Sequence, residues 1–213
     1  QSSHERPDLL AAWRLFFESA LALLDKYDTL ASYFAIDIMP TGDQDPFGLR
    51  RAAQGVVEIA WKIHRPLKLD VLFQAWQAGA PFAQNKPQLA SKIRVYLQER
   101  FYTFAWPSPA PSKDLIDAVL NSASDDLVDT MDRIRALRQM DGKQSLLRAA
   151  KVVERTHNIL KGAKTKPGDV DPARLQEPPE RTLWDRYQAT REEVLRLIRS
   201  RSYAEATTAY GDT

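Results

Sequence analysis

The chain has 213 residues, 44% of them hydrophobic, which is enough apolar material to bury one sizeable core or two small ones. Its 30 basic and 28 acidic side chains give a formal net charge of only +2, which excludes recognition of nucleic acid through bulk charge and leaves local clusters of charge to be considered. The absence of cysteine excludes disulfides and thiolate metal sites, and no apolar run approaches the length of a membrane span, so no membrane partner is expected.

A long helix is predicted from about residue 8 to 32, because apolar residues recur there at steps of three and four. The face expected to be buried consists of Leu9, Leu10, Trp13, Phe16, Phe17, Ala20, Leu21, Leu24 and Tyr27. The turn formers in PTGDQDPFGLRR at 40–51 interrupt this pattern. Asp45 as the cap and Pro46 as the first helical residue are predicted to start the next helix, which ends near His64.

The rest of the chain continues as helices. Segments are predicted at about 70–77 and 89–101, after a cap at Ser112, from Ser124 to near Gly142, from about Gln144 to Lys161, through Leu183 to Ile198, and after Ser202. In the helix at 144–161, Leu147, Ala150, Val153 and Leu160 are expected to face inward. No alternating strand pattern and no internal repeat is present, so the predicted fold class is an all-α helical bundle.

Motifs for catalysis are absent from the sequence. The histidines His4, His64 and His157 are far apart, and none belongs to a metal-binding pattern. The glycine-rich loops that bind nucleotides and the G-x-S-x-G turn that presents a nucleophile are also missing. We therefore assign no catalytic residue, no metal ligand and no cofactor site to this chain, which is more typical of a binding module.

Arg50 and Arg51 are the first candidates for nucleic-acid contact. A guanidinium group can bind a phosphate through two hydrogen bonds. The alternative, which we prefer, is an inward ion pair to Asp43, Asp45 or Glu58. Because adjacent helical residues point about 100° apart, at most one of the two arginines faces any single partner well.

A second cationic cluster is predicted at the end of the 144–161 helix and in the loop after it. Its members are Lys151, Arg155, Asn158, Lys161, Lys164 and Lys166. Spacings of four and three residues put Lys151, Arg155 and Asn158 on one face, and no acid lies between 155 and 168. Such a strip can follow a phosphate backbone, and a solvated helix face with a loose loop is the open alternative.

Several stretches resemble one family. The sequence LLDKYDTLASYFAIDIMPTGDQDPFGLRRAAQGVVEI at 23–59 resembles the β subunit of the bacterial-type glycyl-tRNA synthetase, in which a DKLDTL helix precedes a P-T-G-x-x-D-P-F-x-L-R-R turn and helix. Three later stretches, DLIDAVLNSASDDLVDTMDRIRALRQM, RAAKVVERTHNIL and VDPARLQEPPERTLWD, resemble the anticodon-binding region of the same subunit in the same order. The resemblance covers most of residues 21–190.

This resemblance implies a domain plan. Residues 1–39 would be the C-terminal helical tail of an HD-like domain, residues 40–44 a connecting turn, and residues 45–213 most of a helical DALR-type anticodon-binding domain, truncated at its C-terminus. The implied location is the cytoplasm of a bacterium, or the chloroplast or mitochondrion of a eukaryote.

The resemblance also implies a function, the ATP-dependent attachment of glycine to glycine tRNA. This chain would hold the anticodon arm and backbone of the tRNA, while catalysis takes place on the α subunit or a fused α domain. ATP with Mg²⁺ is expected at that catalytic domain and not in this chain. The open alternative is a helical interaction scaffold that docks against the catalytic subunit with little direct RNA contact.

Overall fold

The computed structural model describes residues 9–40, 44–122, 125–161 and 170–212. These residues form nine α-helices and three short 3₁₀ helices, and the same residues contain no strand. The all-α prediction is therefore confirmed at the level of fold class. None of the helices in this part of the chain is long and apolar enough to cross a membrane.

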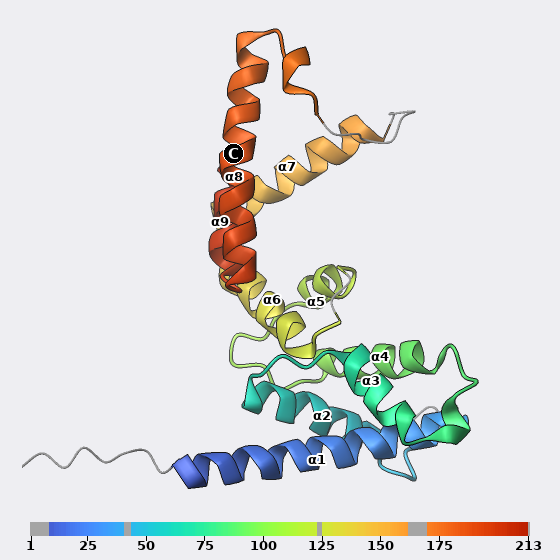
Figure 1. The fold of residues 1–213 in the computed structure, drawn as a ribbon. Helices are drawn as coiled ribbons and strands as arrows, with labels where there is room; N and C mark the ends of the chain where they lie inside the picture. The colour runs from blue at the N-terminus through green and yellow to red at the C-terminus, as the bar shows by residue number, and fades with distance from the viewer. Residues whose placement is uncertain (1–8, 41–43, 123–124, 162–169, 213) are drawn as a thin grey trace, which may run out of the picture. The chain divides into compact units, whose positions relative to one another are not determined.

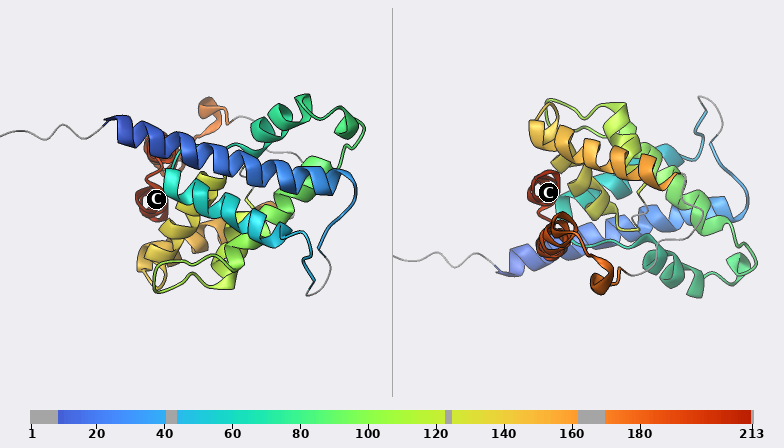
Figure 2. Two further views of the ribbon diagram at one scale, coloured as in Figure 1. Left: turned by 90° about the horizontal axis from the view of Figure 1, so that it is seen from below. Right: turned by 90° about the horizontal axis from the view of Figure 1, so that it is seen from above.

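The chain divides into two compact units, Gln1–Met131 and Asp132–Thr213, with the division inside α6 (Leu127–Met140). The first unit contains α1 (Leu9–Ala35), α2 (Leu49–Ile63), α3 (Leu69–Ala78), η1 (Pro81–Ala83), α4 (Leu89–Gln98), η2 (Glu99–Tyr102) and α5 (Lys113–Leu120). In this unit α1 and α2 lie side by side, and both pack against α4 (Figures 1 and 2). The core they enclose includes Leu30, Phe34, Val56, Ile93 and Phe101.

Only the C-terminal half of α1 is buried. Tyr27 is the one large residue of the predicted face that the core covers, and Leu30 and Phe34 extend the buried stripe from it. The prediction was wrong for Leu9, Leu10, Trp13, Phe16, Phe17, Leu21 and Leu24, which are exposed; Trp13, for example, is 58% exposed. The reason is length: α2 has 15 residues against 27 in α1, so at about 1.5 Å per residue it cannot cover the whole helix.

The start of α2 differs from the prediction in one respect. The Asp45 carboxylate does act as the cap, accepting hydrogen bonds from the backbone N–H of Leu49 at 2.7 Å and of Arg50 at 2.9 Å. Pro46, however, is not the first helical residue. Gly48 adopts the left-handed region at φ 67°, which ends the preceding turn, so the helix begins at Leu49.

Asp126 links two distant segments of the first unit. Its Oδ1 accepts hydrogen bonds from Val128 N at 2.9 Å and Asp129 N at 3.1 Å, so it caps α6, and from Leu67 N at 3.2 Å. Ser124, the predicted cap, lies outside the described residues. Because Asp126 is only 9% exposed, water cannot easily replace these bonds.

Replacing Asp126 by alanine should lower the free energy of unfolding by about 2 to 4 kcal/mol, since the α6 cap is lost and buried N–H groups lose their acceptor. Urea unfolding followed by circular dichroism measures the loss. Asp126→Asn is the matched control, because its amide oxygen can still accept these bonds and should preserve most of the stability. Equal loss in both variants would contradict this role of the acceptor oxygen.

The second unit contains the end of α6, α7 (Gln144–Leu160), η3 (Pro172–Arg174), α8 (Pro178–Arg199) and α9 (Tyr203–Gly211). Within it, α9 packs against both α7 and α8. Gly211 brings α9 close to α7: a Cβ atom added there would be 2.7 Å from the carbonyl oxygen of Ser145 and 3.0 Å from the N atom of Ala149.

The face of α7 expected to point inward is largely exposed. Leu147, Val153 and Leu160 are each about half exposed, at 49%, 54% and 48%. Ala149 is the buried residue of this helix. The prediction was therefore wrong, because α9 packs on the first turns of α7 at Ser145 and Ala149 and leaves its C-terminal half uncovered.

Gly211→Ala should destabilise the second unit by about 1 to 3 kcal/mol, since rigid backbone atoms of α7 occupy the position of the new methyl group. The melting temperature measures the effect. Gly79→Ala is the control, because a Cβ atom there would be 3.6 Å from its nearest neighbour, the carbonyl oxygen of Trp76. A melting temperature equal to that of the parent chain would contradict the prediction, because it would mean that α7 and α9 can accommodate the methyl group without loss of stability.

Candidate nucleic-acid interface

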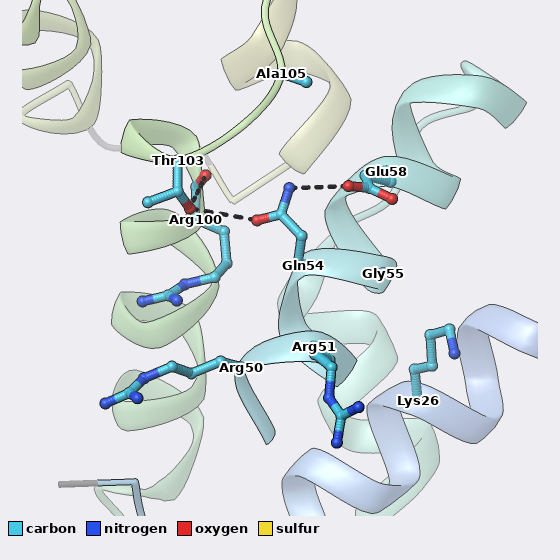
Figure 3. A pocket seen from close by; sticks show the side chains of 9 residues that line it. All are labelled: Lys26, Arg50, Arg51, Gln54, Gly55, Glu58, Arg100, Thr103 and Ala105. Atoms are coloured by element: carbon cyan, nitrogen blue, oxygen red, sulfur yellow. Dashed lines mark hydrogen bonds between the residues drawn. The ribbon is translucent and has the colours of Figure 1, made fainter. Parts of the chain in front are cut away.

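An open hollow of about 640 Å³ in the first unit is lined by four cations and one acid. Lys26 comes from α1, Arg50 and Arg51 come from α2, and Arg100 comes from η2 (Figure 3). The acid is Glu58, whose carboxylate accepts a hydrogen bond from Gln54 Nε2 at 3.1 Å. The lining therefore has an excess of positive charge that favours an anion.

Arg50 and Arg51 extend in different directions from α2, as their adjacent positions require. In Figure 3 the Arg50 side chain extends toward the helix that carries Arg100, and the Arg51 side chain extends on the side of Lys26. Arg51 is exposed, and it has no ion pair within 4.0 Å among the described residues. The predicted ion pair to Asp43 involves a position outside the described residues, so it stays a prediction.

Lys26 reaches the hollow by crossing α2 at Gly55. A Cβ atom placed on Gly55 would be 2.6 Å from Lys26 Cδ and 2.8 Å from Cε, both closer than nonbonded carbon atoms approach. The lysine stem therefore occupies the space that a side chain at position 55 would need. Like Arg51, Lys26 has no ion pair among the described residues.

Arg100 forms the opposite wall and is held more firmly. Its side chain is 15% exposed, it pairs with Glu99 at 3.2 Å, and its guanidinium carbon lies 4.9 Å from the centre of the Tyr96 ring. Its Nε atom is buried and makes no hydrogen bond in the described part of the chain. Burial raises the pKa of the Tyr96 hydroxyl, and the charge of Arg100 opposes that shift.

The second candidate surface is on α7. Lys151, Arg155, Asn158 and Lys161 are all exposed, and within the described ranges the three cations have no acidic partner within 4.0 Å. Lys164 and Lys166 lie outside the described residues. Glu154 is three residues after Lys151 and four before Asn158, so it shares their face and interrupts the basic strip. We call Lys151, Arg155, Asn158 and Lys161 the α7 strip.

Sequence reasoning identified part of these surfaces. It named Arg50, Arg51 and the α7 strip, but it missed Lys26, Gly55 and Arg100. No short motif connects these three positions to the arginine pair, because they meet only through the packing of α1, α2 and η2. Among the described residues, no group of three or more histidine, aspartate and glutamate side chains could hold a metal ion.

The chain resembles proteins of known function. Residues 16–121 match the family model described as "Glycyl-tRNA synthetase beta subunit". The glycine–tRNA ligase β subunit of Acidithiobacillus ferrooxidans is 35% identical over 191 residues, which are 87% of this chain and 27% of that protein. The β subunit of Aromatoleum aromaticum is 37% identical over 169 residues, which are 78% of this chain and 24% of that protein. The β subunit of Desulforamulus reducens is 31% identical over 195 residues, which are 88% of this chain and 27% of that protein.

All three relatives are subunits of aminoacyl-tRNA ligases. This chain belongs to the glycyl-tRNA synthetase β-subunit family and corresponds to one region of that subunit. It spans about a quarter of the length of the curated relatives it matches.

Proposed function

We propose that this chain is the tRNA-binding region of a glycine–tRNA ligase and that it binds the backbone and anticodon arm of glycine tRNA. Catalysis would take place on the α subunit or an α-like domain, where ATP and Mg²⁺ bind. Binding energy used here contributes to the reaction because it orients the tRNA and so positions its acceptor end.

The observation that carries this proposal is the α7 strip. Its three cations are exposed and lack acidic partners among the described residues, so no ion pair has to be broken before they meet phosphates. From Lys151 to Lys161 the strip extends about 15 Å at 1.5 Å per residue, which matches several nucleotides of a polynucleotide strand. Asn158 on the same face offers a donor and an acceptor that a base edge could use.

The domain plan is part of the same proposal. It places an HD-like tail at 1–39, a turn at 40–44 and a DALR-type domain at 45–213, all of them expected to be helical. These limits remain predictions, and the bacterial relatives support a cytoplasmic location only by analogy.

A second function, docking against the catalytic subunit, has one observation in its favour. Trp13, Phe16 and Phe17 form an exposed aromatic cluster on α1, with ring centres 5.9 to 6.3 Å apart. Exposed apolar patches of this kind mark contacts between proteins. Docking at α1 and tRNA binding at α7 use different surfaces, so the two functions are compatible.

The test replaces Lys151, Arg155 and Lys161 together by alanine and measures the affinity for glycine tRNA by electrophoretic mobility shift at several salt concentrations. Losing three phosphate contacts should weaken binding about tenfold or more and reduce the slope of log affinity against log salt by about 2 to 3. Glu154→Gln should have the opposite effect on affinity, because it removes the acid that repels phosphate from this face.

The matched control is the triple alanine variant of Lys143, Arg191 and Arg199, which removes the same charge from exposed positions of the same unit outside the strip. It should bind nearly as well as the parent chain. Equal affinity and equal salt slope for the parent and the α7 variant would refute the proposal that this strip binds tRNA.

A further inference from the structure

We propose that the hollow of the first unit is a phosphate-binding site, built by Lys26 and Arg51, and that it binds a backbone phosphate of the same tRNA. The identity of the ligand rests on the proposed function. The site itself rests on separate observations, because it lies in the other compact unit and shares no residue with the α7 strip.

The first observation is that two cations from separate elements lie on one side of the hollow. Lys26 comes from α1 and Arg51 from α2, Figure 3 shows both on the same side of α2, and only one acid, Glu58, lines the hollow. Like charges brought together by packing repel one another, so folding alone does not favour this arrangement. An anion placed among them would remove the repulsion and gain charge-assisted hydrogen bonds.

The second observation is that the cations have unused binding capacity. Neither Lys26 nor Arg51 has an ion pair among the described residues. Arg100 is not part of this phosphate site, because it pairs with Glu99, packs on the Tyr96 ring and lies on the other side of α2. A phosphate group, with several acceptor oxygens, can take hydrogen bonds from a planar guanidinium and an ammonium at once.

Gly55 is the positioning residue of this site. Glycine within a helix is unfavourable relative to alanine, because it has more freedom to lose on folding. At position 55 a methyl group would overlap Lys26 Cδ at 2.6 Å, so alanine would push the lysine stem away from α2. Gly55 thereby keeps the Lys26 ammonium over the hollow without touching the ligand itself.

The shape of the hollow favours a phosphate that belongs to a polymer. Its volume of about 640 Å³ would accept a small molecule, but its wide opening would not enclose one, and tight small-molecule sites bury most of their ligand. A backbone phosphate needs only to be approached from one side, and neighbouring nucleotides can extend along the open face. We therefore choose the tRNA backbone over free phosphate or pyrophosphate as the ligand.

The experiment compares the parent chain with Lys26→Met, Arg51→Gln and Gly55→Ala, in affinity for glycine tRNA as a function of salt. Lys26→Met and Arg51→Gln each remove one phosphate contact, so each should weaken binding about threefold to tenfold and reduce the salt slope by about 0.7 to 0.9. Gly55→Ala removes no charge, and it should weaken binding by displacing Lys26. In the double variant with Lys26→Met, Gly55→Ala should add little further loss.

The matched control is Lys62→Met, which removes an exposed charge from the last turn of α2 outside the hollow and should leave affinity nearly unchanged. Melting temperatures of all variants verify that they fold. Gly55→Ala is expected to fold normally, because only the flexible end of a lysine has to move. A loss of affinity in Gly55→Ala with an unchanged melting temperature would support a positioning role.

Titration of the parent chain and Lys26→Met with sodium pyrophosphate, followed by calorimetry, separates the sources of the phosphate. Weak binding that disappears in Lys26→Met, together with weaker tRNA binding in the hollow variants, supports the proposal. Loss of pyrophosphate binding with unchanged tRNA affinity overturns the assignment to tRNA. If tRNA affinity and salt slope are unchanged in all hollow variants and only the α7 variant binds more weakly, this inference is overturned and the proposed function stands. If the parent chain does not bind tRNA, both proposals are refuted.

Discussion

The close packing of α2 against α1 and α4 is the constraint on which the first unit depends. The buried side of α2 consists of small and medium residues, among them Ala53, Val56, Val57 and Ala60, which allow neighbouring helices to approach closely. The same approach brings Lys26 of α1 against Gly55 on the solvent side. The core packing therefore also determines which charges surround the hollow, so the scaffold and the candidate site have one physical origin.

The distribution of charge explains how a nearly neutral chain can have basic surfaces. The net charge of +2 is a sum over the whole chain, in which several acids cap helices or form ion pairs while some cations do neither. Asp45 and Asp126 accept hydrogen bonds from backbone N–H groups, and Asp125 pairs with Arg94 at 2.9 Å. Lys26, Arg51 and the cations of the α7 strip have no such partner among the described residues. Binding surfaces can thus form without a large overall charge.

Sequence periodicity predicted the helices well, because an amphipathic pattern depends on local spacing. It could not predict which parts of each apolar face are covered. Trp13 on α1 and Val153 on α7 fit the helical period as well as the buried residues do, yet both are exposed because the helices packed against them cover only part of their length. Periodicity indicates that a face is apolar, and whether that face is buried depends on tertiary structure.

The same distinction applies to the candidate site. Arg50 and Arg51 could be singled out because a capped turn precedes them, and Asp45 does cap that helix. Arg100 and Lys26 carry no local signal, since each looks like an ordinary surface cation in its own helix. Gly55 resembles a weak point of α2 in the sequence, and only the structure shows that the Lys26 stem crosses it.

Glu154 within the α7 strip has a consequence for the speed of the enzyme if the strip binds tRNA as proposed. A carboxylate among the cations lowers the affinity, and affinity differences between related complexes arise mostly from the dissociation rate. An aminoacyl-tRNA ligase has to release its aminoacylated tRNA after every cycle, and product release limits turnover in many enzymes. One acid on this helix would therefore shorten the time for which a tRNA stays on the strip.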